Sequence, residues 1–174
     1  MTPNPLGRRA FLGGSALTVI AMTQHASAGT NDLPSENFGY EVTRSDAEWR
    51  EMLSKPEYVV LRKGSTELPK SNPLWNHFET GTYHCRGCEL TVYDSVWKVP
   101  IDKGWAFFSQ SRENSILMSI DGPEPDGMSS DGPGAMIEAH CRRCGSHLGH
   151  ILTVEGSTLH CINGISLTFK SVST

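Results

Sequence analysis

The sequence lacks both a long hydrophobic run and an excess of positive charge. No stretch approaches the ~20 consecutive apolar residues that a membrane-spanning helix needs, and 15 basic against 19 acidic residues give a formal net charge of −4. Electrostatics therefore gives no reason to expect nucleic acid as a partner. What is present, 37% hydrophobic residues in a chain of 174, suffices for the core of one modest domain.

Acidic residues are absent before Asp32, and this N-terminal region has the features of an export signal. Arg8 and Arg9 precede Ala-Phe-Leu, a weakly apolar run extends to Met22, and Ala26–Ala28 reads as an A-x-A cleavage site. An unprocessed amphipathic segment or a membrane anchor is the alternative. We predict a twin-arginine-type signal at 1–28, a linker at 29–40, a domain at 41–174, and periplasmic localisation.

Cysteine is scarce, and its distribution is informative. The five cysteines form two C-x-x-C pairs and one single residue, Cys161. An odd count in an exported protein leaves at least one thiol outside any set of internal pairs. The two pairs are Cys85 with Cys88 and Cys141 with Cys144.

One helix can be predicted near the start of the domain. Ser45 and Glu48 have the spacing of a capping box, and Trp49, Met52 and Leu53 follow at helical spacing. We expect a helix over roughly residues 46–55 that stops at Pro56. The pattern leaves open whether residues 58–62 extend it or begin a second element.

The chain becomes rich in strand-forming residues from residue 83 onward. Turn-forming clusters separate several of the runs, and residues 121–134 are so rich in Gly, Pro and Asp that we expect an exposed loop there. We predict a mainly β domain, a compact antiparallel fold that is barrel-like or made of two sheets, with a short N-terminal helix. The predicted strands are 90–93, 105–109, 116–120, 135–139, 150–154 and 159–169.

The two C-x-x-C pairs predict one structural zinc ion per chain, held by Cys85, Cys88, Cys141 and Cys144. Four converging thiolates match the tetrahedral preference of zinc, and a metal that joins two distant turns would contribute folding free energy. Disulfides in an oxidising compartment, or a redox dithiol, are the alternatives. A twin-arginine route, which carries folded proteins, would let zinc bind before export.

Cys161 remains after zinc has taken four thiols. On its own it could be a buried, inert residue or a reactive thiol. A short hairpin would bring His147 or His150 alongside it, and an imidazole can activate a thiol or donate a proton. The two histidines could instead be zinc ligands or core residues.

The chain resembles the B-class methionine sulfoxide reductases over about residues 40–170. The order of two C-x-x-C pairs, H-L-G-H and C-I-N is highly specific. The matching segments are 41–49, Tyr83–Cys88, Gly104-Trp105, Cys141–Gly145, His147–His150, Cys161–Gly164 and Ser166–Phe169.

The resemblance implies roles for individual residues. Cys161 would attack the sulfur of methionine-R-sulfoxide and become a sulfenic acid, while His147 and His150 hold and protonate the oxygen directly or through water. Asn163 would belong to the same polar site. Trp105 would form a pocket for the ε-methyl group, with help from Phe108.

The sequence departs from the family at four places. Ala106 and Phe107 replace a usual Pro-Ser, Leu159 replaces a basic residue two before the nucleophile, and no aspartate follows H-L-G-H in residues 151–154. Lys103 occupies the position where many relatives carry a resolving cysteine. Recycling would therefore need an external, thioredoxin-like thiol.

Two alternatives to the reductase remain, a catalytically weakened zinc-containing binding module and a thiol redox sensor. For the reductase we expect methionine-R-sulfoxide in proteins or peptides as substrate and a monomer in solution. We expect neither nucleic acid nor, after signal cleavage, a membrane as partner.

Overall fold

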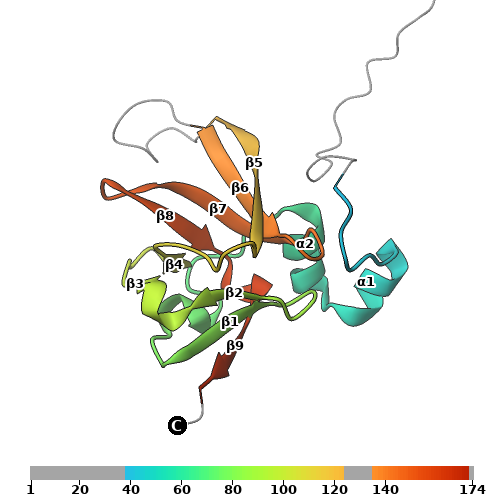
Figure 1. Cartoon of the computed structure of the whole chain (residues 1–174), viewed down its shortest axis with the longest axis horizontal. Coiled ribbons are helices and arrows are strands. Elements are labelled where there is room, and N and C mark those ends of the chain that lie inside the picture. Colours follow the sequence, from blue (N-terminus) through green and yellow to red (C-terminus); the bar gives the residue numbers. More distant parts are fainter. Residues whose placement is uncertain (1–37, 124–134, 173–174) are drawn as a thin grey trace, which may run out of the picture. The chain divides into compact units, whose positions relative to one another are not determined.

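Antiparallel β-strands make up most of the fold, as the sequence predicts (Figure 1). The computed structural model describes residues 38–123 and 135–172. The predicted export signal and most of the predicted linker lie outside these ranges. Within the described ranges, two α-helices and three short 3-10 helices accompany the strands: α1 (Asp46–Met52), α2 (Lys55–Lys63), η1 (Pro73–Asn76), η2 (Ser95–Trp97) and η3 (Gly164–Ser166).

The predicted helix is present, but Pro56 does not terminate it. Helix α1 begins with the predicted capping box, in which the Ser45 N–H donates to Glu48 Oε2 over 2.7 Å. Pro56 lies in the first turn of α2, where its missing N–H costs nothing because no helical acceptor is available there. Residues 58–62 therefore belong to a second helix. Neither helix of the described ranges is long and apolar enough to cross a membrane.

The strands form two antiparallel sheets. The smaller has the order β2-β1-β9 and the larger β3-β4-β8-β7-β6-β5, and in the described part of the chain they do not close into a barrel. The two-sheet form of the prediction is therefore confirmed. The strands are β1 (Gly81–Cys85), β2 (Thr91–Asp94), β3 (Lys98–Val99), β4 (Ala106–Phe108), β5 (Ile116–Pro123), β6 (Ala135–Cys141), β7 (His147–Val154), β8 (Ser157–Ile162) and β9 (Leu167–Ser171).

Strands β1 and β3 were not among the predicted strands, several predicted boundaries are displaced by one to three residues, and two differences are larger. The run 159–169 is not one strand, because η3 interrupts it and sends β9 to the other sheet. The predicted loop at 121–134 begins too early, since Asp121–Pro123 still belong to β5. Residues 124–134 lie outside the described ranges.

The main core contains residues of both sheets and of both helices. Its aromatic centre is Tyr93 stacked on Phe108 at 4.3 Å, with Tyr83 edge-on to Phe108 at 4.9 Å. A second, smaller cluster surrounds Cys161 and comprises Phe107, Leu152, Val154 and Leu159. Alternation along β4 and β8 explains the division, because successive residues of a strand face opposite sides of the sheet.

Candidate active site and metal centre

A row of cross-strand neighbours on the larger sheet brings the predicted nucleophile next to a histidine. Cys161 on β8 lies directly opposite His150 on β7 and Phe107 on β4. His150 in turn lies opposite Glu138 on β6, which lies opposite Ser119 on β5. Directly opposed residues point to the same face, with Cβ atoms about 5 Å apart. The predicted hairpin therefore places His150 beside the thiol.

An irregularity in β7 puts His147 on the same face as His150. The pairing of β6 with β7 shifts between Ala139 and His140, which leaves one extra residue on β7. In a regular strand, residues three apart face opposite sides, and a bulge reverses that relation. The two imidazole rings are edge-on to each other with their centroids 5.3 Å apart.

Each of these histidines has a carboxylate partner from another strand. His147 Nδ1 lies 2.6 Å from Glu138 Oε1, and His150 Nε2 lies 2.9 Å from Asp121 Oδ2. Burial raises the pKa of Glu138, but the hydrogen bond and charge of His147 outweigh it, so the net pKa is lowered. His147 is 1% exposed and its Nε2 has no partner, whereas 15% of the His150 side chain is exposed. Neither acidic residue was among the predicted site residues.

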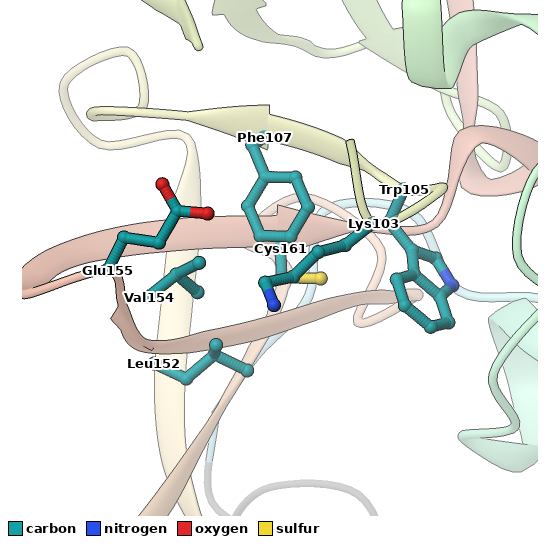
Figure 2. A pocket seen from close by; sticks show the side chains of 7 residues that line it. All are labelled: Lys103, Trp105, Phe107, Leu152, Val154, Glu155 and Cys161. Carbon is teal, nitrogen blue, oxygen red and sulfur yellow. The ribbon is translucent and has the colours of Figure 1, made fainter. Parts of the chain in front are cut away.

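A largely apolar pocket of about 380 Å³ opens at Cys161 (Figure 2). Trp105 lines this pocket, and its Nε1–H donates to the Glu67 carbonyl over 3.2 Å. Figure 2 shows Lys103 among the side chains that line the same pocket as Cys161. The lining residues are Lys103, Trp105, Phe107, Leu152, Val154, Glu155 and Cys161.

The structure does not bring Phe108 to the pocket. Phe108 is fully buried between Tyr83 and Tyr93, on the opposite face of β4 from Cys161. Phe107 lines the pocket instead. Phe108 was expected in the pocket because it follows the Gly104-Trp105 motif. Successive residues of a strand face opposite sides of the sheet, so Phe107 and not Phe108 faces the pocket.

Asn163 is close in sequence to Cys161, but both polar atoms of its side chain form hydrogen bonds with backbone groups. Its Oδ1 accepts from the Glu67 N–H over 3.0 Å and its Nδ2 donates to the Leu148 carbonyl over 3.1 Å. The residue is 2% exposed. The amide therefore joins β7 to the segment around Glu67, whose carbonyl in turn accepts from the Trp105 indole N–H.

Glu67 is a central residue of the site that sequence reasoning missed. Its buried carboxylate accepts from the backbone N–H groups of Gly164 at 2.5 Å and Ile165 at 2.9 Å. Burial raises its pKa despite these two bonds. Nothing in the local sequence marks Glu67, because all these contacts are made with residues far along the chain.

The surroundings of Cys161 favour the protonated thiol. Burial raises the pKa of Cys161 to about 12, and the Glu67 carboxylate adds to the rise, while the Lys103 ammonium works against it. A thiol with this pKa is protonated at neutral pH and needs a base before it can act as a nucleophile. His150 is the directly opposed residue that can accept the proton.

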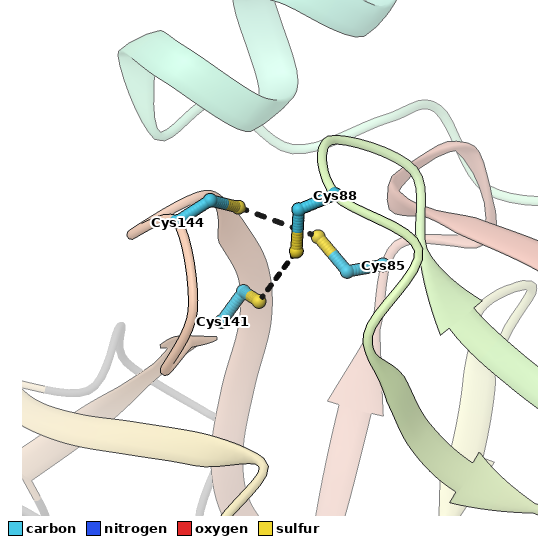
Figure 3. A group of neighbouring side chains, drawn as sticks. All are labelled: Cys85, Cys88, Cys141 and Cys144. Carbon is cyan, nitrogen blue, oxygen red and sulfur yellow. Dashed lines mark hydrogen bonds between the residues drawn. The ribbon is translucent and has the colours of Figure 1, made fainter. Parts of the chain in front are cut away.

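The four remaining cysteines converge on one point, as predicted (Figure 3). Their sulfur atoms all lie within 4.8 Å of one another, with Cys85 and Cys144 3.7 Å apart and Cys88 and Cys141 3.5 Å apart. Zn–S bonds of about 2.3 Å in a tetrahedron would place sulfurs about 3.8 Å apart. All four are free thiols, so the residues present fit a tetrahedral metal ion. The neighbouring His84 and His140 lie in strands β1 and β6.

The turns that carry these cysteines are shaped by close packing. Gly145 has a φ of +68°, and a Cβ there would lie 2.7 Å from the Tyr40 ring, which packs against this turn. A Cβ on Gly87 would lie 2.6 Å from Ser146 Oγ. The arginines of the motifs are engaged in ion pairs with acidic residues: Arg86 with Glu57, and Arg142 and Arg143 with Glu41.

The fold and site thus define a two-sheet β protein with a cluster of four thiols that could hold a metal ion and a separate thiol in an apolar pocket. The SelR domain model matches residues 53–171. Peptide methionine sulfoxide reductase B5 of Oryza sativa subsp. japonica is 34% identical over 135 residues, covering 75% of this chain and 92% of that protein. The chain therefore belongs to the SelR family.

Other relatives extend the match along the chain. Peptide methionine sulfoxide reductase MsrB of Agrobacterium fabrum is 34% identical over 137 residues, covering 76% of this chain and 95% of that protein. The chloroplastic reductase B2 of Arabidopsis thaliana is 32% identical over 170 residues, covering 95% of this chain and 72% of that protein. The crystal structure of a Mis18 Yippee-like domain is also similar, at 20% identity and a TM-score of 0.44, and covers 55% of this chain and 100% of that one.

Proposed function

We propose that this chain reduces methionine-R-sulfoxide to methionine with Cys161 as the nucleophile. As a member of the SelR family whose relatives are methionine sulfoxide reductases, it is an oxidoreductase that acts on methionine sulfoxide. The observation that carries the finer proposal is the position of Cys161, in the wall of an apolar pocket and directly opposite His150. The pocket walls suit the methyl and methylene groups of the substrate.

The chemistry requires a proton to move from sulfur to oxygen. His150 takes the Cys161 proton, the thiolate attacks the sulfoxide sulfur, and the proton passes to the sulfoxide oxygen, directly or through water. The oxygen is transferred to Cys161, so that thiol plus sulfoxide gives sulfenic acid plus thioether. His147, held by Glu138 through Nδ1, packs edge-on against His150 and supports that ring from inside the sheet.

An external thiol completes the cycle. Because the other four cysteines belong to the cluster, no further thiol remains in the sequence to condense with the sulfenic acid. A first external thiol displaces water and forms a mixed disulfide, and a second releases Cys161 and leaves with the first as a disulfide. A thioredoxin-like protein would supply both.

The four-cysteine cluster would hold a structural zinc ion in this proposal, and the N-terminal residues 1–28 would direct export to the periplasm. The support for zinc is the set of four converging thiols from two distant turns. The support for export is the Arg8-Arg9 pair followed by Ala26–Ala28. We expect the mature protein to act as a monomer.

The test is turnover of racemic dabsyl-methionine sulfoxide with dithiothreitol, followed by chiral separation. We expect the R epimer to be consumed, the S epimer to be spared, and Cys161→Ser to lose activity at least about a hundredfold because the nucleophile is gone. Ser157→Ala, at the exposed start of β8, is a control that keeps the thiol. Activity of Cys161→Ser above a few per cent would exclude the mechanism, and binding without turnover by the unchanged chain would favour a binding module.

A further inference from the structure

The two histidines beside Cys161 are held through opposite ring nitrogens. Glu138 occupies Nδ1 of His147, while Asp121 occupies Nε2 of His150. A carboxylate accepts hydrogen bonds and does not donate them, so the nitrogen that faces it carries the proton. The neutral His147 ring then has its lone pair on Nε2, and the neutral His150 ring has its lone pair on Nδ1.

Only one of these lone pairs is suited to exchange a proton with a substrate. Nε2 of His147 is fully enclosed and has no partner, so it has no route to a molecule in the pocket. His150 is 15% exposed and lies directly opposite Cys161. Its Nδ1 is therefore the imidazole nitrogen that can serve the thiol.

The carboxylate of Asp121 comes from a strand that is not adjacent to β7. In the sheet order β7-β6-β5, Asp121 lies two strands from His150. The pairing of β5 with β6 becomes irregular between Ile120 and Pro123, and Gly122 has a φ of +85°. Such a bulge twists an edge strand and redirects its side chains, which allows Asp121 to reach across β6.

We propose that Asp121 is the positioning residue for His150, keeping the proton on Nε2 so that Nδ1 stays available to Cys161. The proposal rests on the proposed function and deepens it. In each cycle Nδ1 accepts the proton of the Cys161 thiol and gives it to the sulfoxide oxygen, while the proton on Nε2 stays in its hydrogen bond to Asp121. An imidazole held in the wrong tautomer would present an N–H to the thiol and could not accept its proton.

The first measurement is independent of activity. A long-range ¹⁵N–¹H correlation spectrum of the whole protein, with His150 assigned by His150→Gln, should show protonated Nε2 and unprotonated Nδ1 in the neutral ring. In Asp121→Asn the amide can donate as well as accept, so a mixture of tautomers should appear. Asp121→Glu keeps a carboxylate and should recover the single form at least in part. Glu113→Gln, which removes one exposed acidic group, should leave the pattern unchanged.

The second measurement connects the tautomer to turnover. Asp121→Asn should lower kcat at least about tenfold with little change in KM, since general acid–base assistance is lost and binding is not. In the His150→Gln background the same substitution should have no further effect. An unchanged His150 spectrum in Asp121→Asn, or an equal loss of kcat with and without His150, would overturn the proposal. Failure of the proposed function gives a different result, a chain inactive on sulfoxide whose His150 tautomer still depends on Asp121.

Discussion

The protonation state of the Cys161 thiol depends on the charged residues around it as well as on its burial. Burial and the Glu67 carboxylate both hold the proton on its sulfur, and the Lys103 ammonium opposes them. Lys103 also lines the same pocket as Cys161 (Figure 2). Leu159 stands two positions before the proposed nucleophile, where the resemblance leads one to expect a basic residue, and the cation near the thiol is instead Lys103, between β3 and β4.

We predict that Lys103→Met slows alkylation of Cys161 by iodoacetamide about twofold to fivefold at neutral pH. Loss of the cation should raise the thiol pKa further, and the exposed position of Lys103 keeps the effect modest and dependent on salt. The measurement is the rate of modification of the Cys161 peptide by mass spectrometry at low ionic strength. Lys55→Met, at the exposed start of α2, should not change the rate; equal rates for Lys103→Met and the unchanged protein would contradict the assignment.

At the residue scale, local motifs predicted those contacts of the site that join residues close together in the sequence. The hairpin that places His150 opposite Cys161 follows from two strands joined by a tight turn. Glu67 could not be predicted in this way, because it binds Gly164, 97 residues away, and carries no motif of its own. Asp121 was hidden for a related reason, since its Gly- and Pro-rich surroundings indicate a loop while the sheet extends strand β5 through it.

Among the elements, β7 lies so close to β8 at Gly149 that there is no room for a side chain there. A Cβ on Gly149 would lie 2.2 Å from the Cys161 carbonyl oxygen and 2.9 Å from Ile162 Cα. Both are backbone atoms of β8, and displacing them would disturb the pairing of β8 with its neighbouring strands. The glycine thus allows β7 and β8 to approach beside the bulge that turns His147 and His150 to one face.

Gly149→Ala should therefore destabilise the protein by about 2–3 kcal/mol through this steric conflict. It should also lower activity, since any relief moves Cys161 away from His150. Urea unfolding measures the first effect and sulfoxide turnover the second. Gly39→Ala is the matched control, because a Cβ there meets nothing within 4 Å. Equal unfolding midpoints for the two variants would contradict this prediction, because they would show that β8 can shift to make room for the added methyl group.

Element boundaries were predictable where local chemistry decides them. The Ser45–Glu48 capping box located the start of α1. Pro56 was misread because a proline ends one helix and is equally compatible with the first turn of the next. The split of 159–169 depends on tertiary contacts, since Glu67 fixes the turn at Gly164 and Ile165 that separates β8 from β9.

For the whole domain, the four-cysteine cluster connects the two sheets. Cys85 ends β1 of the smaller sheet, and Cys141 ends β6 of the larger one. Cys85, Cys141 and Cys144 belong to the main core, whereas Cys161 packs against the separate small cluster. The four-cysteine cluster and Cys161 are thus separate parts of the molecule, and the proposed function gives the first a role in stability and the second a role in chemistry.

This separation predicts that metal and activity respond to different substitutions. The purified protein should contain one zinc per chain, and Cys141→Ser should lose it together with about 10 °C or more in Tm, because metal binding contributes to folding. Cys161→Ser should keep both the metal and the Tm. If Cys141→Ser does not fold at all, the Tm of the unchanged protein measured with and without a strong chelator compares the metal-bound and metal-free states instead.

The metal should also remain in place during catalysis. After one equivalent of sulfoxide and before any reductant, native mass spectrometry should find zinc still bound and one added oxygen, and a dimedone-type probe should label Cys161. A cluster cysteine could resolve the sulfenic acid only by leaving the metal, which the core position of Cys85, Cys141 and Cys144 opposes. A disulfide between Cys161 and any of the four, with loss of zinc, would instead make this chain a redox switch and refute recycling by an external thiol.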